Sequence, residues 1–271
     1  MPPLKKLFNV YIFGNLHVAL ASFSLTKLSL LTQQNSDNII PFFVFFATIL
    51  SYNYIRLMRI NTIKSELYNE INRWRIYLIL ISIFALTACA FLIVKIRWQA
   101  LISLMPFALL TGFYVLPPSI SSKMTLRSLP GFKIFVIAFT WAGITVLFPL
   151  SQYDMVDASI FWLFFQRFLF LIVLTIPFDI RDVAYDSETL KTLPIWLGIK
   201  NAKVLGFIVL GLYLAISIFI LKPVYQGIEI FIALCLGVLL LKSSTNRSYN
   251  YYAFWIEGIP ILWLILYHIF A

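Results

Sequence analysis

Three aspartates follow closely on one of the long apolar runs of the chain, at Asp179, Asp182 and Asp186. Residues three, four and seven positions apart share one face of an α-helix, so on a helix these carboxylates would line a single side. Carboxylates this close repel one another unless water or a cation lies between them, and Mg²⁺ takes one or two such ligands together with substrate phosphates. The spacing therefore favours a divalent-cation site, with a solvated acidic loop at a helix end as the alternative.

The composition indicates what kind of element carries these aspartates. The 271 residues are 61% hydrophobic and 12% charged, whereas soluble domains carry about 25% charged residues. This excludes a soluble domain, and it excludes a disordered chain because so apolar a sequence does not stay solvated. The two cysteines, Cys89 and Cys235, lie in apolar runs, which excludes a disulfide framework and a thiolate metal site.

Nine apolar runs have the length of membrane-spanning helices, which need about 20 mostly apolar residues. They are too long for the alternating strands of a β-barrel. We therefore expect an all-α, polytopic integral membrane protein that forms a single domain over residues 1–271. A cleaved signal peptide is the alternative for the first run, but Asn9, Asn15 and His17 interrupt it. The nine runs cover residues 7–31, 38–58, 76–94, 96–116, 130–150, 159–178, 203–222, 226–242 and 252–270.

The distribution of basic residues predicts how these helices are oriented. Lysine and arginine are enriched in the cytoplasmic loops of membrane proteins. With the amino terminus inside, sixteen of the 21 lysines and arginines fall on cytoplasmic segments. The loops after the second and sixth helices, which include the aspartates, then face the cytoplasm. The net charge of +10 indicates contact with membrane lipid and not with nucleic acid, because no soluble basic domain exists.

Ionisable side chains inside predicted spans also point to specific contacts. A charged group at such a depth costs about 2.5–3.5 kcal/mol if it faces lipid. For Arg167 we expect a structural role, either reaching the membrane surface or paired inside the bundle. Glu257 is a candidate base or acceptor-binding carboxylate, with a hydrogen-bonded packing role as the alternative. His17 is a candidate for the same cavity, and an interhelical hydrogen bond is its alternative.

The aspartate stretch continues into Lys191-Thr192-Leu193-Pro194 and Gly198. Together these residues resemble the second aspartate-rich motif of the UbiA superfamily of intramembrane prenyltransferases. Tyr114, the segment 129–133 and Trp141 resemble the connection between the fourth and fifth helices of that family. The resemblance implies a UbiA-like helical bundle that uses Mg²⁺ to activate an isoprenyl diphosphate. It also implies transfer of the prenyl group to a lipophilic, aromatic acceptor.

The resemblance implies a role for each part of the site. Asp179, Asp182 and Asp186 would be the catalytic metal ligands. Lys191 occupies the basic position of the motif, and membrane-lipid anchoring is the alternative role for the basic residues outside it. The full set of diphosphate-binding candidates is Asn53, Arg56, Arg59, Lys123, Arg127 and Lys191. Aromatic faces can stabilise an allylic cation in a dry pocket, and the candidate pocket residues are Tyr52, Tyr114, Trp141, His17 and Glu257.

The chain departs from the family in its first motif. Counting from Asn53, the two aspartate positions of that motif are Leu57 and Asn61, neither of which is an anionic ligand. Arg56 and Arg59 lie beside them, and guanidinium groups bind phosphate oxygens in a bidentate manner. One alternative is that these arginines hold the diphosphate, so that one metal suffices. The others are a UbiA-type terpene cyclase or diphosphate lyase, and a non-catalytic lipid- or isoprenoid-binding protein.

Overall fold

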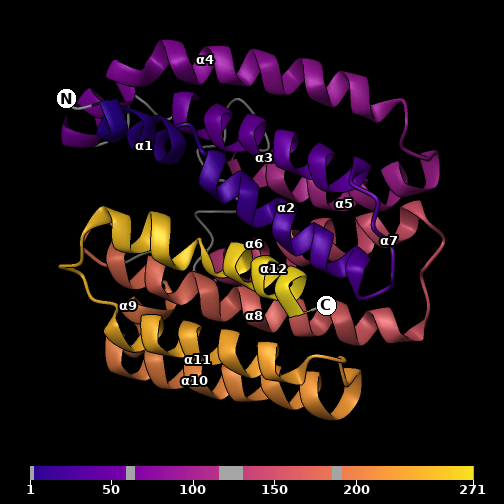
Figure 1. Ribbon diagram of the computed structural model, residues 1–271. Helices are drawn as coiled ribbons and strands as arrows, with labels where there is room; N and C mark the ends of the chain where they lie inside the picture. Colours follow the sequence, from indigo (N-terminus) through magenta and orange to yellow (C-terminus); the bar gives the residue numbers. More distant parts are fainter. Residues whose placement is uncertain (1–2, 59–64, 116–130, 185–190, 271) are drawn as a thin grey trace.

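The computed structural model describes residues 3–58, 65–115, 131–184 and 191–270, and every regular element in these ranges is a helix. Lipid offers the backbone no hydrogen-bonding partner, so a spanning chain must pair its backbone groups within helices. Figure 1 shows the long helices lying side by side, with their connections gathered at two opposite ends. We name these the Asp182 end and the Asp154 end after a residue at each.

Fifteen helical segments follow one another along the described parts of the chain, with η marking those that are π-helical. They are α1 Pro3–Phe13, α2 Leu16–Leu31, α3 Ile39–Met58, α4 Ser65–Ile93, α5 Trp98–Val115, α6 Lys133–Ala142, η3 Gly143–Leu147, α7 Phe148–Gln152, α8 Ala158–Asp182, α9 Leu193–Leu197, α10 Ile199–Ala215, η5 Ile216–Leu221, α11 Gln226–Lys242, η6 Tyr251–Ile256 and α12 Ile259–Phe270.

The helices support the expectation of an integral membrane protein, but the expected count of nine spans is not confirmed. Among the described residues, six helices are long and apolar enough to cross a membrane, or seven if the bent pair α1–α2 is one span. The apolar helix Trp98–Tyr114 within α5 is shorter than these six, and α11 has 17 residues. Both lie near the lower limit of about 17 residues for a span.

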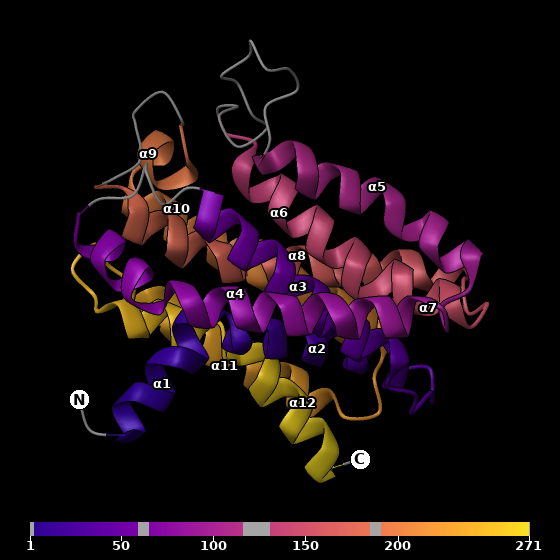
Figure 2. The same cartoon turned by 90° about the horizontal axis from the view of Figure 1, so that it is seen from above.

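The first predicted helix, 7–31, is broken in the structure. The segments Leu7–Phe13 and Leu16–Leu31 are bent by 60° relative to each other, and Figure 2 shows α1 leaving the bundle at an angle. Asn15 at the break has a φ of 59°, a left-handed conformation that ends a right-handed helix. A Cβ atom at Gly14 would lie 2.5 Å from the Val10 carbonyl oxygen, so the bend requires glycine there.

Helix α8 forms the centre of the largest hydrophobic core, where it packs against α6, α10 and α11. It begins at an N-cap, Asp157, whose carboxylate accepts hydrogen bonds from the Ser159 backbone N–H at 2.8 Å and the Ser159 hydroxyl at 2.6 Å. The predicted run ended at residue 178, whereas the helix continues to Asp182. Loss of apolar character therefore did not mark the end of the helix.

A buried polar network lies in the half of the bundle toward the Asp154 end. The guanidinium of Arg167 is 1% exposed, donates to the Leu25 carbonyl at 2.8 Å and lies 5.2 Å from the Trp263 ring centroid. Glu229 on α11 accepts from the Tyr213 hydroxyl and lies within electrostatic range of Arg167. Arg167 thus pairs inside the bundle, and Glu229 is a partner that the sequence did not single out.

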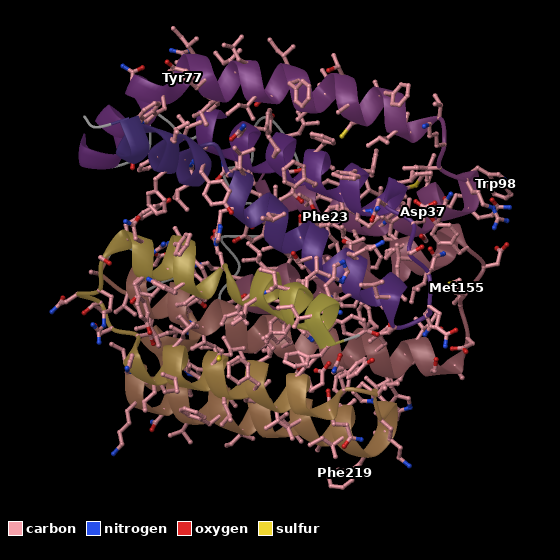
Figure 3. All side chains as sticks on the ribbon, in the orientation of Figure 1. Phe23, Asp37, Tyr77, Trp98, Met155 and Phe219 are labelled. Carbon is pink, nitrogen blue, oxygen red and sulfur yellow. The ribbon has the colours of Figure 1, made fainter. Side chains whose placement is uncertain are left out.

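Large apolar side chains cover much of the outer surface of the bundle. Figure 3 shows Phe219 pointing away from the helices at the edge of the molecule, where it is 73% exposed. Trp98, Asp37 and Met155 lie together at the Asp154 end in the same view. An apolar exterior of this kind matches lipid, where exposed apolar groups carry no cost.

Candidate active site

Several helices bring their ends together at the Asp182 end of the bundle. α3 and α8 both end there, while α6 and the η6–α12 pair begin there. α2 packs against both α3 and α12, and α6 packs along α8. The polar residues that the sequence scatters over about 240 positions therefore come from a small number of adjoining helix ends.

Asp179 forms a buried ion pair with Lys133, the first residue of α6. Lys133 Nζ lies 2.8 Å from Asp179 Oδ1, and the two side chains are 8% and 1% exposed. The preceding turn positions Lys133, because Gly131 has a φ of 75°, which favours glycine. The sequence analysis included Lys133 only as part of a helix connection and did not predict it as a site residue.

Asp182, the last residue of α8, is paired with its neighbour Arg181. Nε and Nη2 of Arg181 lie 2.7 and 3.2 Å from the two carboxylate oxygens of Asp182, so the contact is bidentate. The guanidinium also lies 5.3 Å from the Phe178 ring centroid and 5.4 Å from that of Tyr252. Arg181 is the second site residue that the sequence analysis missed.

The predicted aspartate face is thus present in part. Asp179 and Asp182 lie one turn apart at the end of α8, as their spacing indicated. Asp186 lies outside the described residues, as do the candidates Arg59, Lys123 and Arg127. Within the described ranges no group of three histidine, cysteine or acidic side chains comes close enough to hold a metal ion.

Asn53 has a different environment from the one expected for a diphosphate ligand. Its side chain is fully buried and accepts a hydrogen bond from Asn15 Nδ2 at 2.7 Å. Its own amide donates to Ser82 Oγ at 3.1 Å and to the Leu78 carbonyl at 3.4 Å. Because these contacts occupy both ends of the amide, Asn53 joins α2, α3 and α4.

Arg56 and Lys191 are the described basic candidates. The Arg56 guanidinium donates to the Phe13 carbonyl oxygen and lies 5.9 Å from the centroid of the Phe13 ring. It therefore rests against the last turn of α1. Lys191 is exposed at the start of the segment that leads into α9, so it is accessible to a ligand approaching from this end.

Two of the aromatic candidates contact each other near Glu257. Tyr52 and Trp141 meet edge to face, with ring centroids 6.3 Å apart. Glu257, Tyr114 and Arg56 all lie within electrostatic range of the Tyr52 hydroxyl, and Arg181 and Arg56 both act on Glu257. Tyr52, Trp141 and Glu257 lie well inside the bundle yet keep some accessible surface. We name Tyr52, Trp141 and Glu257 the Tyr52 cluster.

His17 forms hydrogen bonds with two other helical segments. Its Nε2 lies 2.9 Å from the Phe254 carbonyl oxygen and its Nδ1 lies 2.7 Å from the Tyr11 hydroxyl. Because a carbonyl only accepts, Nε2 carries the proton, and in the neutral ring Nδ1 accepts from Tyr11. His17 therefore joins α1, α2 and η6. These contacts are hydrogen bonds between helices, which was the alternative expected for this residue.

The carboxylates at the Asp182 end fit a magnesium ion that binds together with a phosphate ligand. Mg²⁺ prefers carboxylate oxygens and is bound in such sites by one or two protein carboxylates plus substrate phosphates. Asp179 and Asp182 supply two carboxylates one turn apart, and Asp182 is partly accessible. The cations that pair with them, Lys133 and Arg181, are themselves groups that bind phosphate.

Comparison with solved structures defines the fold. No protein-family model matches the sequence, and no curated protein matches it either. A UbiA homolog from Archaeoglobus fulgidus, solved bound to GPP and Mg²⁺, superimposes with a TM-score of 0.59 at 14% identity, covering 94% of both chains. The chain has the UbiA fold. A second structure of a UbiA homolog from the same organism gives a TM-score of 0.52 at 16% identity, again over 94% of both chains.

The UbiA fold extends over nearly the whole chain, so the match does not rest on one helix hairpin. At these identities the similarity reports the fold and not the activity. The fold match depends on the backbone, whereas the motif resemblance depends on side-chain identity, so the two are independent observations. The stretch that resembles a UbiA motif begins at the end of α8 with Asp179 and Asp182, which form the ion pairs with Lys133 and Arg181.

Proposed function

We propose that this chain is a divergent member of the UbiA superfamily that acts on an isoprenyl diphosphate with Mg²⁺. It transfers the prenyl group to a lipophilic, aromatic acceptor. The observation that carries the proposal is the position of Asp179 and Asp182, one turn apart at the end of α8 in a UbiA-type bundle. The similar structure from A. fulgidus holds GPP and Mg²⁺, which supports the same ligand class here.

In this proposal the two ion pairs exchange partners when substrate binds. Asp179 and Asp182 turn to the metal, while Lys133 and Arg181 turn to the phosphate oxygens. When bound, Mg²⁺ neutralises charge on the diphosphate and so makes it a better leaving group. Because each carboxylate and each cation has a partner both before and after the exchange, no charge is left unpaired in a region of low polarity.

Tyr52, Trp141 and Glu257 act on the prenyl group and on the acceptor. The bond between C1 of the prenyl group and the diphosphate oxygen breaks, and the electron pair leaves with the diphosphate. Tyr52 and Trp141 exclude water and present aromatic faces to the allylic cation, an interaction of about 2 kcal/mol when desolvated. The acceptor forms the new bond to C1, and Glu257 is placed to take the proton that the acceptor loses.

The orientation in the membrane is part of the proposal. The excess of lysine and arginine around the Asp182 end supports a cytoplasmic location for that end and for the amino terminus. Cysteine labelling in intact cells tests this. A Lys191→Cys variant is expected to react with a membrane-impermeant maleimide only after lysis, and an Asp154→Cys variant to react before lysis. The reverse pattern would exclude the cytoplasmic site.

Binding of radiolabelled geranyl diphosphate to purified protein in nanodiscs tests the function. The wild type is expected to bind it in Mg²⁺ and to lose binding in EDTA. Asp182→Asn should weaken Mg²⁺-dependent binding at least tenfold. Asp154→Asn is the matched control, because Asp154 lies at the opposite end with a φ of 53° that asparagine tolerates. Equal binding by the wild type and Asp182→Asn would refute the proposed metal role.

Product analysis in the same samples separates the alternatives. Prenyl transfer requires an added acceptor, for which 2-naphthol serves as a probe. Diphosphate release without acceptor would instead indicate a cyclase or lyase. Tight Mg²⁺-dependent binding without diphosphate release under either condition would indicate a non-catalytic isoprenoid-binding protein.

A further inference from the structure

Thr192 carries a buried hydroxyl group that has no hydrogen-bond partner. The residue is 2% exposed, and within the described ranges its Oγ1 atom forms no hydrogen bond. A hydroxyl in this state has lost its contacts with water and gained none in return, which costs free energy. Such groups are rare in native proteins, and a ligand that completes the hydrogen bond is one of the explanations for them.

Helix α9 does not use this hydroxyl as its cap. Thr192 is the N-cap residue of α9, where a threonine hydroxyl usually accepts from the backbone N–H of the second or third helical residue. The second residue is Pro194, which has no N–H, and the side chain forms no capping bond. The first turn closes through the backbone instead, because the Trp196 N–H donates to the Thr192 carbonyl at 2.9 Å. The hydroxyl is therefore free of any role in the helix.

The residue that follows Thr192 keeps the hydroxyl inside the protein. Leu193 is buried in the largest hydrophobic core, and α9 packs against both α8 and α10. Turning the hydroxyl out to water would pull Leu193 away from these contacts. The apolar core thus holds a polar group in a position where the ligand-free protein does not use it.

The segment that carries Thr192 lies against the turn that positions Lys133. A Cβ atom at Gly131 in this turn would lie 3.9 Å from the carbonyl oxygen of Lys191. Gly131 comes two residues before Lys133, whose Nζ lies 2.8 Å from Asp179 Oδ1. The unpartnered hydroxyl and the buried ion pair therefore flank the same turn.

A phosphate oxygen that Lys133 binds would supply the partner that the hydroxyl lacks. A lysine ammonium is a compact charge with three donors and leaves the other lone pairs of the oxygen open. A threonine hydroxyl donates one further hydrogen bond, and bonds to charged acceptors are about twice as strong as neutral ones. A buried water molecule is the alternative partner, and it predicts that diphosphate affinity does not depend on the hydroxyl.

We infer that Thr192 is a diphosphate-binding residue whose hydroxyl donates to a phosphate oxygen held by Lys133. The inference rests on the proposed function, because it assumes that a diphosphate binds at the pair of Lys133 and Asp179. It adds a neutral donor to the charged groups of the site. The ligand-free protein carries the cost of the unpartnered hydroxyl, and the bound ligand removes it.

Thr192→Val tests the inference, because valine keeps the shape of threonine and lacks the hydroxyl. Inorganic diphosphate and Mn²⁺ are added to the full-length protein in nanodiscs, and bound diphosphate is measured. Affinity should fall about tenfold, the loss of one hydrogen bond to a charged group. Thr192→Ser keeps the hydroxyl and should bind like the wild type. Wild-type affinity in Thr192→Val would overturn the inference.

The same variant should not weaken the ligand-free protein. Valine at this position breaks no hydrogen bond and removes an unpartnered polar group. The midpoint of unfolding of Thr192→Val in mixed SDS micelles should therefore equal or exceed that of the wild type. A hydroxyl with a structural role would give the opposite sign. A lower midpoint, or a variant that does not fold, would overturn the inference.

Thr140→Val is the matched control. Thr140 is also buried, and its Oγ1 atom also has no hydrogen-bond partner within the described ranges. It lies seven residues after Lys133 on α6, which is about 10 Å farther along the helix. Its valine variant should keep the unfolding midpoint and bind Mn²⁺–diphosphate like the wild type. An equal loss of affinity in both valine variants would overturn the assignment of Thr192.

These outcomes separate the inference from the proposed function. Wild-type affinity in Thr192→Val would remove only the role of Thr192 and would leave the prenyl-diphosphate proposal intact. Failure of the wild type to bind Mn²⁺–diphosphate at all would reject both.

Discussion

Lys133 Nζ lies 2.8 Å from Asp179 Oδ1, and the two side chains are almost completely buried between α6 and α8. A pair in such surroundings is stable only while both charges are present, because desolvating a lone charge costs several kcal/mol. The same pair supplies a carboxylate and an ammonium group to the candidate site. Stability and ligand binding therefore depend on the same two residues, and variants can separate the two effects.

Removing one partner of this pair should cost more than removing both. Lys133→Met leaves the Asp179 carboxylate buried without its cation, and we expect a loss of about 3–5 kcal/mol in the free energy of unfolding. The double variant Lys133→Met with Asp179→Leu should recover most of that loss while losing Mg²⁺-dependent binding. Unfolding in mixed SDS micelles measures the difference. Additive losses in the double variant would contradict the pairing.

The Arg167 network should affect stability without affecting the diphosphate site. Arg167→Ala removes the hydrogen bond to the Leu25 carbonyl and the contact with the Trp263 ring, so we expect a loss of about 1–3 kcal/mol in the free energy of unfolding. Arg97→Ala, which removes an exposed pair with Asp154, should cost less than about 1 kcal/mol. Binding of inorganic diphosphate by folded protein should be unchanged in both variants. A tenfold loss of binding in folded Arg167→Ala would show that the two ends are coupled.

Two glycines on neighbouring helices should respond to alanine in opposite directions. A Cβ atom at Gly143 would lie 2.1 Å from Cε1 of Phe107, whereas one at Gly112 would have no atom within 4 Å. Gly143→Ala should therefore destabilise the protein by about 1–3 kcal/mol through overpacking. Gly112→Ala in the interior of α5 should stabilise it by about 0.5–1 kcal/mol. Adding Phe107→Leu to Gly143→Ala should relieve the clash and restore part of the stability.

The N-cap of α8 should make stability depend on pH in the acid range. Hydrogen bonds from Ser159 lower the pKa of Asp157 below its ordinary value, so its folded-state pKa is lower than its unfolded-state pKa. The stabilisation is then complete above the unfolded pKa of about 4 and is lost as the pH falls through the lowered folded-state value. The melting temperatures of the wild type and Asp157→Ala should differ at pH 6 and converge toward pH 2. A constant difference over this range would contradict the charged cap.

Much of the fold could be predicted from the sequence because lipid leaves few options for an apolar chain. The run 226–242 coincides with α11, and 252–270 differs from η6–α12 by one residue at its start. The break at Asn15 could not be predicted in the same way, since its positive φ has no signature in hydropathy. The end of α8 was misplaced for a related reason, because the helix continues through polar residues after the apolar run stops.

The candidate site was predictable only where a single helix carries it. The spacing of Asp179 and Asp182 already implied a common helix face, and the structure has both at the end of α8. Their counter-ions were missed, since nothing in the sequence connects Lys133 to a carboxylate 46 positions later. The contacts of Asn53 could not be predicted for the converse reason. Its motif position suggested a ligand, whereas packing of α2 and α4 against α3 uses both ends of its amide.

The contact of Arg167 with α2 has a consequence for biogenesis. When α8 leaves the translocon, its guanidinium can already find the Leu25 carbonyl and the Ser29 hydroxyl of the earlier helix, whereas Glu229 has yet to be synthesised. The cost of placing a guanidinium in lipid therefore favours retention of α2 beside the insertion machinery until α8 arrives. Crosslinking of stalled nascent chains would detect this early pairing, and its absence would mean that α8 enters the bilayer with its charge unsatisfied.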